Sequence, residues 1–99
     1  MRDPEIMQRV KDILAQISEI APGHAVELRI PPYSAIQCVE GPKHTRGTPP
    51  NVVEMQAEIL FGLIAGTIEW NSAISTGAIH ASGERSDLSA LFTRLTSSK

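Results

Sequence analysis

The segment from Gly41 to Asn51 most constrains how this chain can fold. It holds three prolines and two glycines within eleven residues, and no acidic residue lies between Glu40 and Glu54. Proline lacks the backbone N–H that helices and central strands use, and glycine favours turns, so this composition predicts a loop. A loop of this length is uncommon in a small domain unless it is functional or disordered. Because its prolines stiffen it and strand-like segments flank it, we interpret it as an ordered loop at the mouth of the fold.

Length, charge, cysteine content and hydropathy limit the classes of protein to which this chain can belong. A chain of 99 residues predicts one domain, spanning residues 1–99. The net charge of −2 argues against a nucleic-acid-binding protein, which would present a strongly basic face. A single cysteine is typical of the reducing cytoplasm, where we expect the protein. The longest apolar run, 59–65, is too short to cross a bilayer, so we expect no integral membrane association.

Four helices are predicted from apolar residues at helical spacing and from capping residues at the ends. Asp3 begins the first helix, and glycines end the second and third. Ser86 is the predicted cap of the last helix, with Asp87 in its first turn. In chain order the helices run from Asp3 to Ala21, from Gln56 to Ala65, from Thr67 or Glu69 to Gly77, and from Ser86 to Leu95.

Four strands are predicted at 25–30, 33–40, 52–55 and 78–82. The first alternates cleanly and should place one face on a core and the other in water. Because its alternation is blurred, the second strand is interpreted as covered on both faces. The short connection between these two predicts an antiparallel pair. Strands in a run, with helices before and after, predict an α+β fold with a mainly antiparallel sheet covered on one face by helices.

The C-terminal half resembles sterol carrier proteins in its turn and packing residues. The segment 26–54 is similar to the actinobacterial branch called bacterial sterol-carrier-protein orthologues, and also resembles the C-terminal domain of mycothiol-dependent maleylpyruvate isomerases. The resemblance covers nearly the whole chain. It implies a five-stranded sheet roofed by helices, often with an apolar cavity for lipids or fatty acyl-CoA. The matching C-terminal residues are Gly66, Ala73, Gly77, Ile79, Gly83, Leu88 and Leu91.

The loop carries residues that could hold an anion. Arginine offers a planar fork of donors, threonine hydroxyls and loop amides add more, and glycine permits a close approach. In the alternative, Arg46 pairs with Glu40 or Glu54 and Asn51 ties down the backbone. The candidate ligand-binding residues of the loop are Lys43, His44, Thr45, Arg46 and Asn51.

Trp70 is the candidate ligand contact outside the loop. It opens a short helix and could lie at the edge of the core, where an apolar ligand would enter, although it and Ile74 could equally fill the core. Cys38 could be a reactive thiol, but its place within a strand favours an inert buried residue. His24, His44 and His80 lack metal-ligand spacing, so we expect no metal and no cofactor.

Two hypotheses of function follow. The first is a non-enzymatic binding module that carries a lipid or acyl-type apolar ligand, with an anionic head group near residues 41–51. The alternative is an auxiliary domain that docks on a partner protein, as the isomerase resemblance implies, or that forms a homodimer. An enzyme is least expected, because no nucleophile–base pair or metal set is readable.

Overall fold

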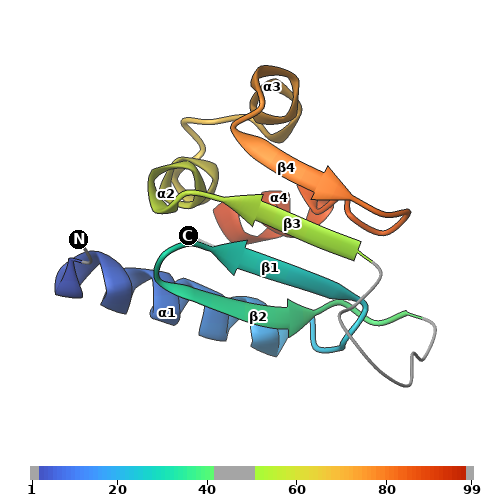
Figure 1. Ribbon diagram of the computed structural model, residues 1–99, viewed down its shortest axis with the longest axis horizontal. Helices are drawn as coiled ribbons and strands as arrows, with labels where there is room; N and C mark the ends of the chain where they lie inside the picture. Colours follow the sequence, from blue (N-terminus) through green and yellow to red (C-terminus); the bar gives the residue numbers. More distant parts are fainter. Residues whose placement is uncertain (1–2, 42–50, 98–99) are drawn as a thin grey trace.

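The computed structural model describes residues 3–41 and 51–97 (Figure 1). All four predicted helices and all four predicted strands are present, which confirms the α+β class. The fifth strand that the resemblance implies is not seen in the described ranges. In chain order the elements are α1 (Pro4–Ile20), β1 (Val26–Ile30), β2 (Ser34–Cys38), β3 (Asn51–Met55), α2 (Ala57–Ala65), α3 (Trp70–Thr76), β4 (Ile79–Ser82) and α4 (Ser89–Ser97).

The strands form one mixed sheet in the order β2-β1-β3-β4. The outer pairs, β1 with β2 and β3 with β4, are antiparallel, whereas the central pair of β1 and β3 is parallel. The register gives the reason. Cys38 at the end of β2 and Asn51 at the start of β3 both pair with Val26 at the start of β1. The chain therefore re-enters the sheet at the end where β1 begins, so β3 must run in the same direction as β1.

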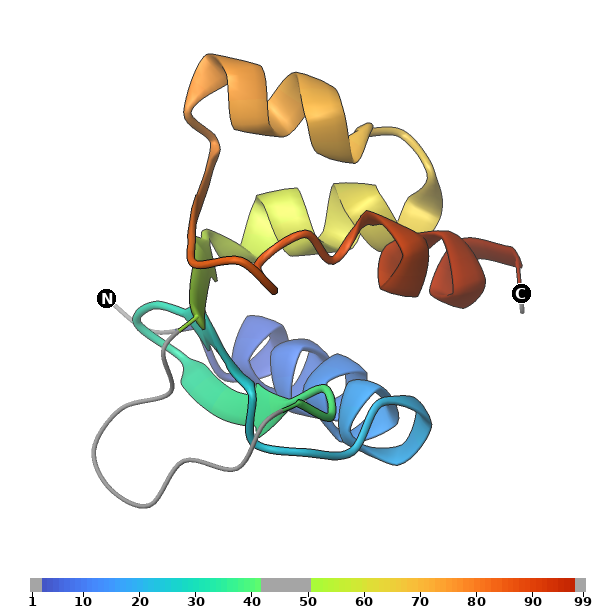
Figure 2. The same cartoon turned by 90° about the vertical axis from the view of Figure 1, so that its right-hand side faces the viewer.

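The helices lie on one side of the sheet. Figure 1 shows α1 and α4 behind the strands, and the edge-on view in Figure 2 separates them from β2. The side chains of β1 that face the helices are fully buried, while Glu27 and Arg29 on the opposite face are partly exposed. We call this second side the open face. Among the described helices, none combines the length and apolar character that crossing a bilayer requires.

β2 corrects one prediction. Ala35 and Gln37 are exposed, Ile36 is half-buried and Cys38 is buried, so the strand is covered on one face and not on both. The blurred alternation arises because β2 is an edge strand. Its open face tolerates a small alanine, and its covered face is only partly sheltered at the rim of the sheet.

The start of α4 corrects the prediction that Ser86 caps this helix. The helix begins at Ser89, and the carboxylate of Asp87 accepts a hydrogen bond from the Ser89 backbone N–H at 2.9 Å. The Ser86 hydroxyl instead donates to the Gly83 carbonyl at 2.7 Å, so the predicted Ser86 cap is wrong. A serine in a tight turn can bond to backbone three residues back, and this local bond competes with a capping role.

Glycines set the ends of the short helices, as predicted. Gly66 after α2 and Gly77 after α3 have φ values of 82° and 81°, in the left-handed region that favours glycine. Gly62 within α2 serves a different need. A Cβ atom there would lie 2.3 Å from the side chain of Ile68, so only glycine allows the α2–α3 connection to pass this close.

Candidate functional site

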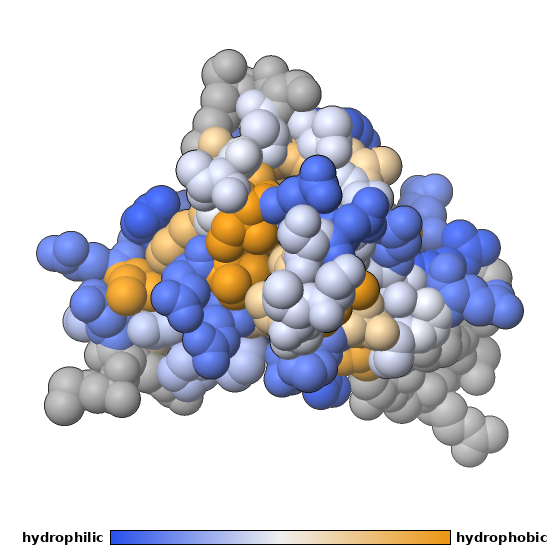
Figure 3. All heavy atoms as spheres, turned by 90° about the horizontal axis from the view of Figure 1, so that it is seen from above, coloured by the Kyte–Doolittle hydropathy of each residue, from blue (hydrophilic) through white to orange (hydrophobic). Residues whose placement is uncertain are grey.

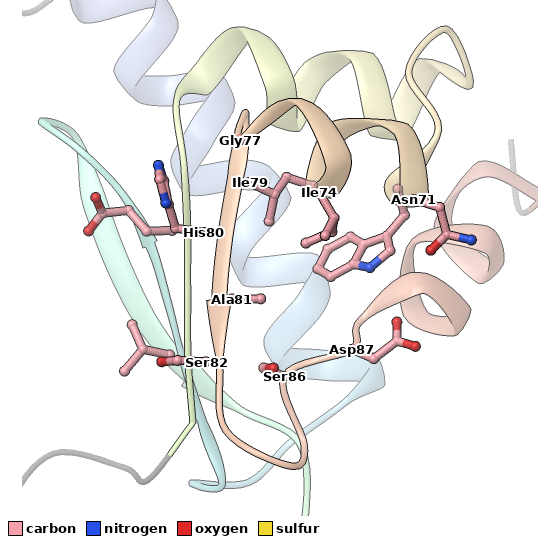
Figure 4. Close-up of a pocket in the computed structure, with 12 residues that line it drawn as sticks. Asn71, Ile74, Gly77, Ile79, His80, Ala81, Ser82, Ser86 and Asp87 are labelled. Carbon is pink, nitrogen blue, oxygen red and sulfur yellow. The ribbon is translucent and has the colours of Figure 1, made fainter.

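A hollow of about 790 Å³ lies along the outer edge of β4. We call it the β4 hollow. Because β4 is an edge strand, no described strand pairs with its outer side. Four segments line this space: the strand β3 through Val52 and Glu54, the helix α3 through Trp70, Asn71 and Ile74, the strand β4 itself, and residues 86–87 leading into α4 (Figure 4).

The alternation of β4 divides the β4 hollow into two parts. Ile79 and Ala81 pair with the buried residues Met55 and Val53 and therefore face the helices. Their neighbour His80 points to the opposite side of the strand, as Figure 4 shows. The hollow thus has an apolar part on the helix side and continues around the strand edge onto the open face.

The apolar part is built around Trp70. This residue is only 7% exposed, and its ring stacks on Phe92 with 5.9 Å between ring centroids. Ile74, one helical turn later, is 37% exposed and is the one large hydrophobic residue in the described chain that solvent reaches to this extent. Seen from above, apolar atoms gather near the middle of the face with hydrophilic side chains around them (Figure 3).

The polar groups of the helix side gather at one place. Asn71 and Asp87 carry their polar ends on the same side of the β4 hollow (Figure 4). Hydrogen bonds from Ser89 lower the pKa of Asp87, so this carboxyl is ionised at neutral pH. The indole N–H of Trp70 has no acceptor within the described ranges. No lysine or arginine from those ranges lines the hollow.

On the open face, charged residues form a row across the central strands. Arg29 pairs with Glu27 on its own strand, and its Nη1 atom lies 4.0 Å from Oε1 of Glu54 on β3. The hydrogen bond to Glu27, with the charge of that residue, raises the pKa of Arg29. Glu54, which was considered as a partner for Arg46, therefore already lies beside another cation.

Asn51 has a structural role in this geometry. It is 4% exposed; its Nδ2 donates to the Ala25 carbonyl at 2.7 Å, and its Oδ1 accepts from the Arg85 backbone N–H at 2.9 Å. These bonds tie the start of β3 to the chain before β1 and to the turn that carries Ser86. The geometry therefore favours the backbone-tying alternative for Asn51 over direct ligand contact, and makes this residue a support for one wall of the β4 hollow.

The remaining loop candidates, Lys43, His44, Thr45 and Arg46, lie outside the described residues, and their anion-binding role stays a prediction. The ends of the loop can be placed. Asn51 bonds to Arg85, and a Cβ atom on Gly41 would lie 3.1 Å from the Arg85 side chain. Val52, next to Asn51, pairs with Ser82 of β4. The loop is thus attached at the Ser82 end of the hollow.

Cys38 matches its interpretation as a buried residue. It is fully buried, and burial raises the pKa of its thiol to about 11, so almost none of it is the reactive thiolate at neutral pH. A search of residues 3–41 and 51–97 for three or more neighbouring histidine, cysteine or acidic side chains that could hold a metal ion finds none.

The structure brings together residues that the sequence patterns did not connect. Trp70 and Ile74 were considered as cavity lining, but Asn71, Ala81 and Asp87 were not. The sequence of β4 did contain a pattern that could have indicated the hollow. Strand alternation places Ala81 on the same side as Ile79, and a small residue at an inward position leaves space that a larger side chain would fill.

Comparison with known proteins identifies the family to which this chain belongs. A search of curated proteins finds no match. The family described as bacterial SCP ortholog matches over residues 2–93, nearly the whole chain. This agrees with the resemblance noted in the segment 26–54 and in the glycine-punctuated C-terminal half. The chain therefore belongs to the bacterial SCP ortholog family.

Proposed function

We propose that this protein binds a small, largely apolar molecule in the β4 hollow and performs no chemistry on it. The family suggests a small-molecule or lipid-binding module. The observation that carries the proposal is the hollow itself, about 790 Å³ beside Trp70, Ile74 and Ile79. This volume lies within the range of about 300–1,000 Å³ that is typical of ligand pockets, and the lining is apolar and polar in about equal parts.

The exposed side chain of Ile74 favours the binding of an apolar ligand through the hydrophobic effect. Ile74 is 37% exposed, and an apolar ligand lying against it would remove both surfaces from water. The rigid ring of Trp70, held by its stacking on Phe92, provides a surface that need not rearrange. Trp70 also borders a second hollow of about 430 Å³ between α2, α3 and α4, so a ligand that shifted this ring would affect both spaces.

A lipid or acyl chain is the ligand class that the family implies. Its apolar part would lie along β4 against Trp70, Ile74 and Ile79. The anionic head group predicted near residues 41–51 depends on Lys43, His44 and Arg46, and stays a prediction. The alternative role, docking on a partner protein, also stays a prediction. A concave site of small-molecule size supports the binding role more directly than the docking role.

Binding of the neutral apolar dye Nile red tests this proposal. Trp70 is the single tryptophan, so its fluorescence reports occupancy of the β4 hollow. We expect saturable binding at micromolar concentration. Ile74→Glu should weaken it about tenfold or more, because a carboxylate would have to be buried under the dye.

Ser75→Glu is the matched control. It adds the same charge to the same helix at an exposed position that does not line the hollow, and it should leave the affinity within about twofold, as a screened surface charge does. Absence of saturable binding, or equal affinities of the Ile74→Glu and unsubstituted proteins, would contradict the proposal.

A further inference from the structure

A largely buried tryptophan lines the β4 hollow, and its indole N–H has no hydrogen-bond partner among the described residues. Only 7% of the surface of this residue, Trp70, is exposed. Buried polar groups nearly always have partners, and an unpaired one lowers stability. A hydrogen-bond acceptor on a ligand in the hollow would supply the missing partner.

The neighbouring polar groups restrict what this ligand atom can be. Asn71 follows Trp70 at the start of α3, and its amide both donates and accepts. Asp87, on the same side of the hollow, is an ionised carboxylate and only accepts. A group that satisfies Trp70 and Asp87 together must accept one hydrogen bond and donate another.

Building on the proposed function, we propose that the β4 hollow selects an apolar molecule that ends in a neutral hydroxyl or primary amide. Both groups accept from an N–H and donate to a carboxylate. A carboxylate or phosphate head group could accept from Trp70, but it would place a second negative charge beside Asp87. An ammonium head group would suit Asp87 but has no lone pair for Trp70.

The described charges around the site favour this selection. Asp87 is held in place by the Ser89 N–H, and the other carboxylate that lines the hollow, Glu54, lies on the open face beside Arg29. A neutral polar head group therefore meets no opposing charge, whereas an anionic one meets Asp87 without a described cation lining the same space.

Three ten-carbon probes test the selection: 1-decanol, decanoate and decylamine, measured at neutral pH by Trp70 fluorescence and by calorimetry. We expect 1-decanol to bind about three- to tenfold more tightly than decanoate, because Asp87 repels a second negative charge but is itself exposed, so that solvent screens part of the repulsion. Trp70→Phe keeps the aromatic ring and removes the N–H. It should weaken 1-decanol about three- to tenfold, measured by calorimetry.

Asp87→Asn tests the charge and keeps an acceptor for the Ser89 backbone N–H, since the side-chain oxygen of asparagine also accepts hydrogen bonds. It should bring the affinities of decanoate and 1-decanol to within about twofold, because the like-charge repulsion is removed. Asp12→Asn on α1, which changes the net charge equally at an exposed position outside the hollow, should leave the difference unchanged.

The outcomes separate this inference from the proposed function. Decanoate binding as tightly as 1-decanol, or equal effects of Asp87→Asn and Asp12→Asn, would overturn the head-group selection and leave apolar binding in place. Failure of all three probes together with Nile red would overturn both.

Discussion

The two edges of the sheet are built differently. At the β2 edge, α1 packs on the strand, Cys38 is fully buried, and Ser34 and Ile36 are half-buried. At the β4 edge, Ile79 is buried but the other three residues of the strand are exposed, and the space outside the strand is the β4 hollow. We call the β2 edge, which α1 covers, the closed edge, and the β4 edge, which borders the hollow, the open edge.

The difference follows from the two helices. α1 has 17 residues and extends along the strands, so its apolar stripe can reach the length of β2. α3 has seven residues and stands at the start of β4, with Gly77 directly between the two elements. A two-turn helix cannot fill the space beside a strand that carries Ala81 rather than a larger residue. We infer that the closed edge supplies stability and the open edge supplies a site.

The largest expected effect comes from opening the closed edge. Leu14→Ala should lower the free energy of unfolding by about 2–5 kcal/mol, because it removes a fully buried side chain and leaves a cavity beneath α1. Urea denaturation measures the change. Nile red affinity of the folded protein should stay within about twofold, since distant sites act independently. A loss of binding equal to that of Ile74→Glu would contradict the separation of the two edges.

The second effect is a pH dependence from Cys38. Its folded pKa is about 11, above the reference value of 9.0, so the unfolded chain releases the thiol proton first as the pH rises. The stability of the folded state is therefore complete below about pH 8 and falls by about 2–3 kcal/mol as the pH rises through about 11.

Cys38→Ala provides the control for this dependence. Its overall stability should be lower, because a buried side chain is lost, but its decline between neutral pH and about pH 11 should be shallower by the same 2–3 kcal/mol, since no thiol titrates. Urea unfolding at matched pH values measures both proteins. Parallel pH profiles would show that the β2 edge is less dry than its burial indicates.

Local patterns were sufficient for the elements of this fold. Helix caps, glycine stops and strand alternation depend on neighbouring residues, and the structure confirms Asp3, Gly66 and Gly77 in the roles predicted for them. Ser86 was misassigned because two local bonds competed for one hydroxyl. The parallel pairing of β3 with β1 was not predictable, because it depends on the end of the sheet at which Asn51 enters and on which strand β3 pairs with.

The site was less predictable than the fold. Their apolar character suggests Trp70 and Ile74 as cavity residues. Whether these side chains fill the core or line a hollow depends on the length of α3 and on its angle to β4. Asp87 and Asn71 line the same hollow although they are 16 positions apart in the chain, and a hydrogen bond from Arg85 to Asn51 ties the turn before α4 to the start of β3. Contacts between segments this far apart in the chain leave no mark in local periodicity.

The smallest expected effect on stability, and the sharpest contrast with Leu14→Ala, comes from Ile74→Ala at the open edge. Because Ile74 is already 37% exposed and borders a hollow, its truncation should change the free energy of unfolding by about 1 kcal/mol or less. The same truncation removes apolar surface that the ligand would cover, so Nile red affinity should fall about three- to tenfold. Urea denaturation and Trp70 fluorescence measure the two quantities on one sample. A stability loss as large as that of Leu14→Ala would mean that Ile74 belongs to the core, and the open edge would then lack the apolar wall on which the proposed site depends.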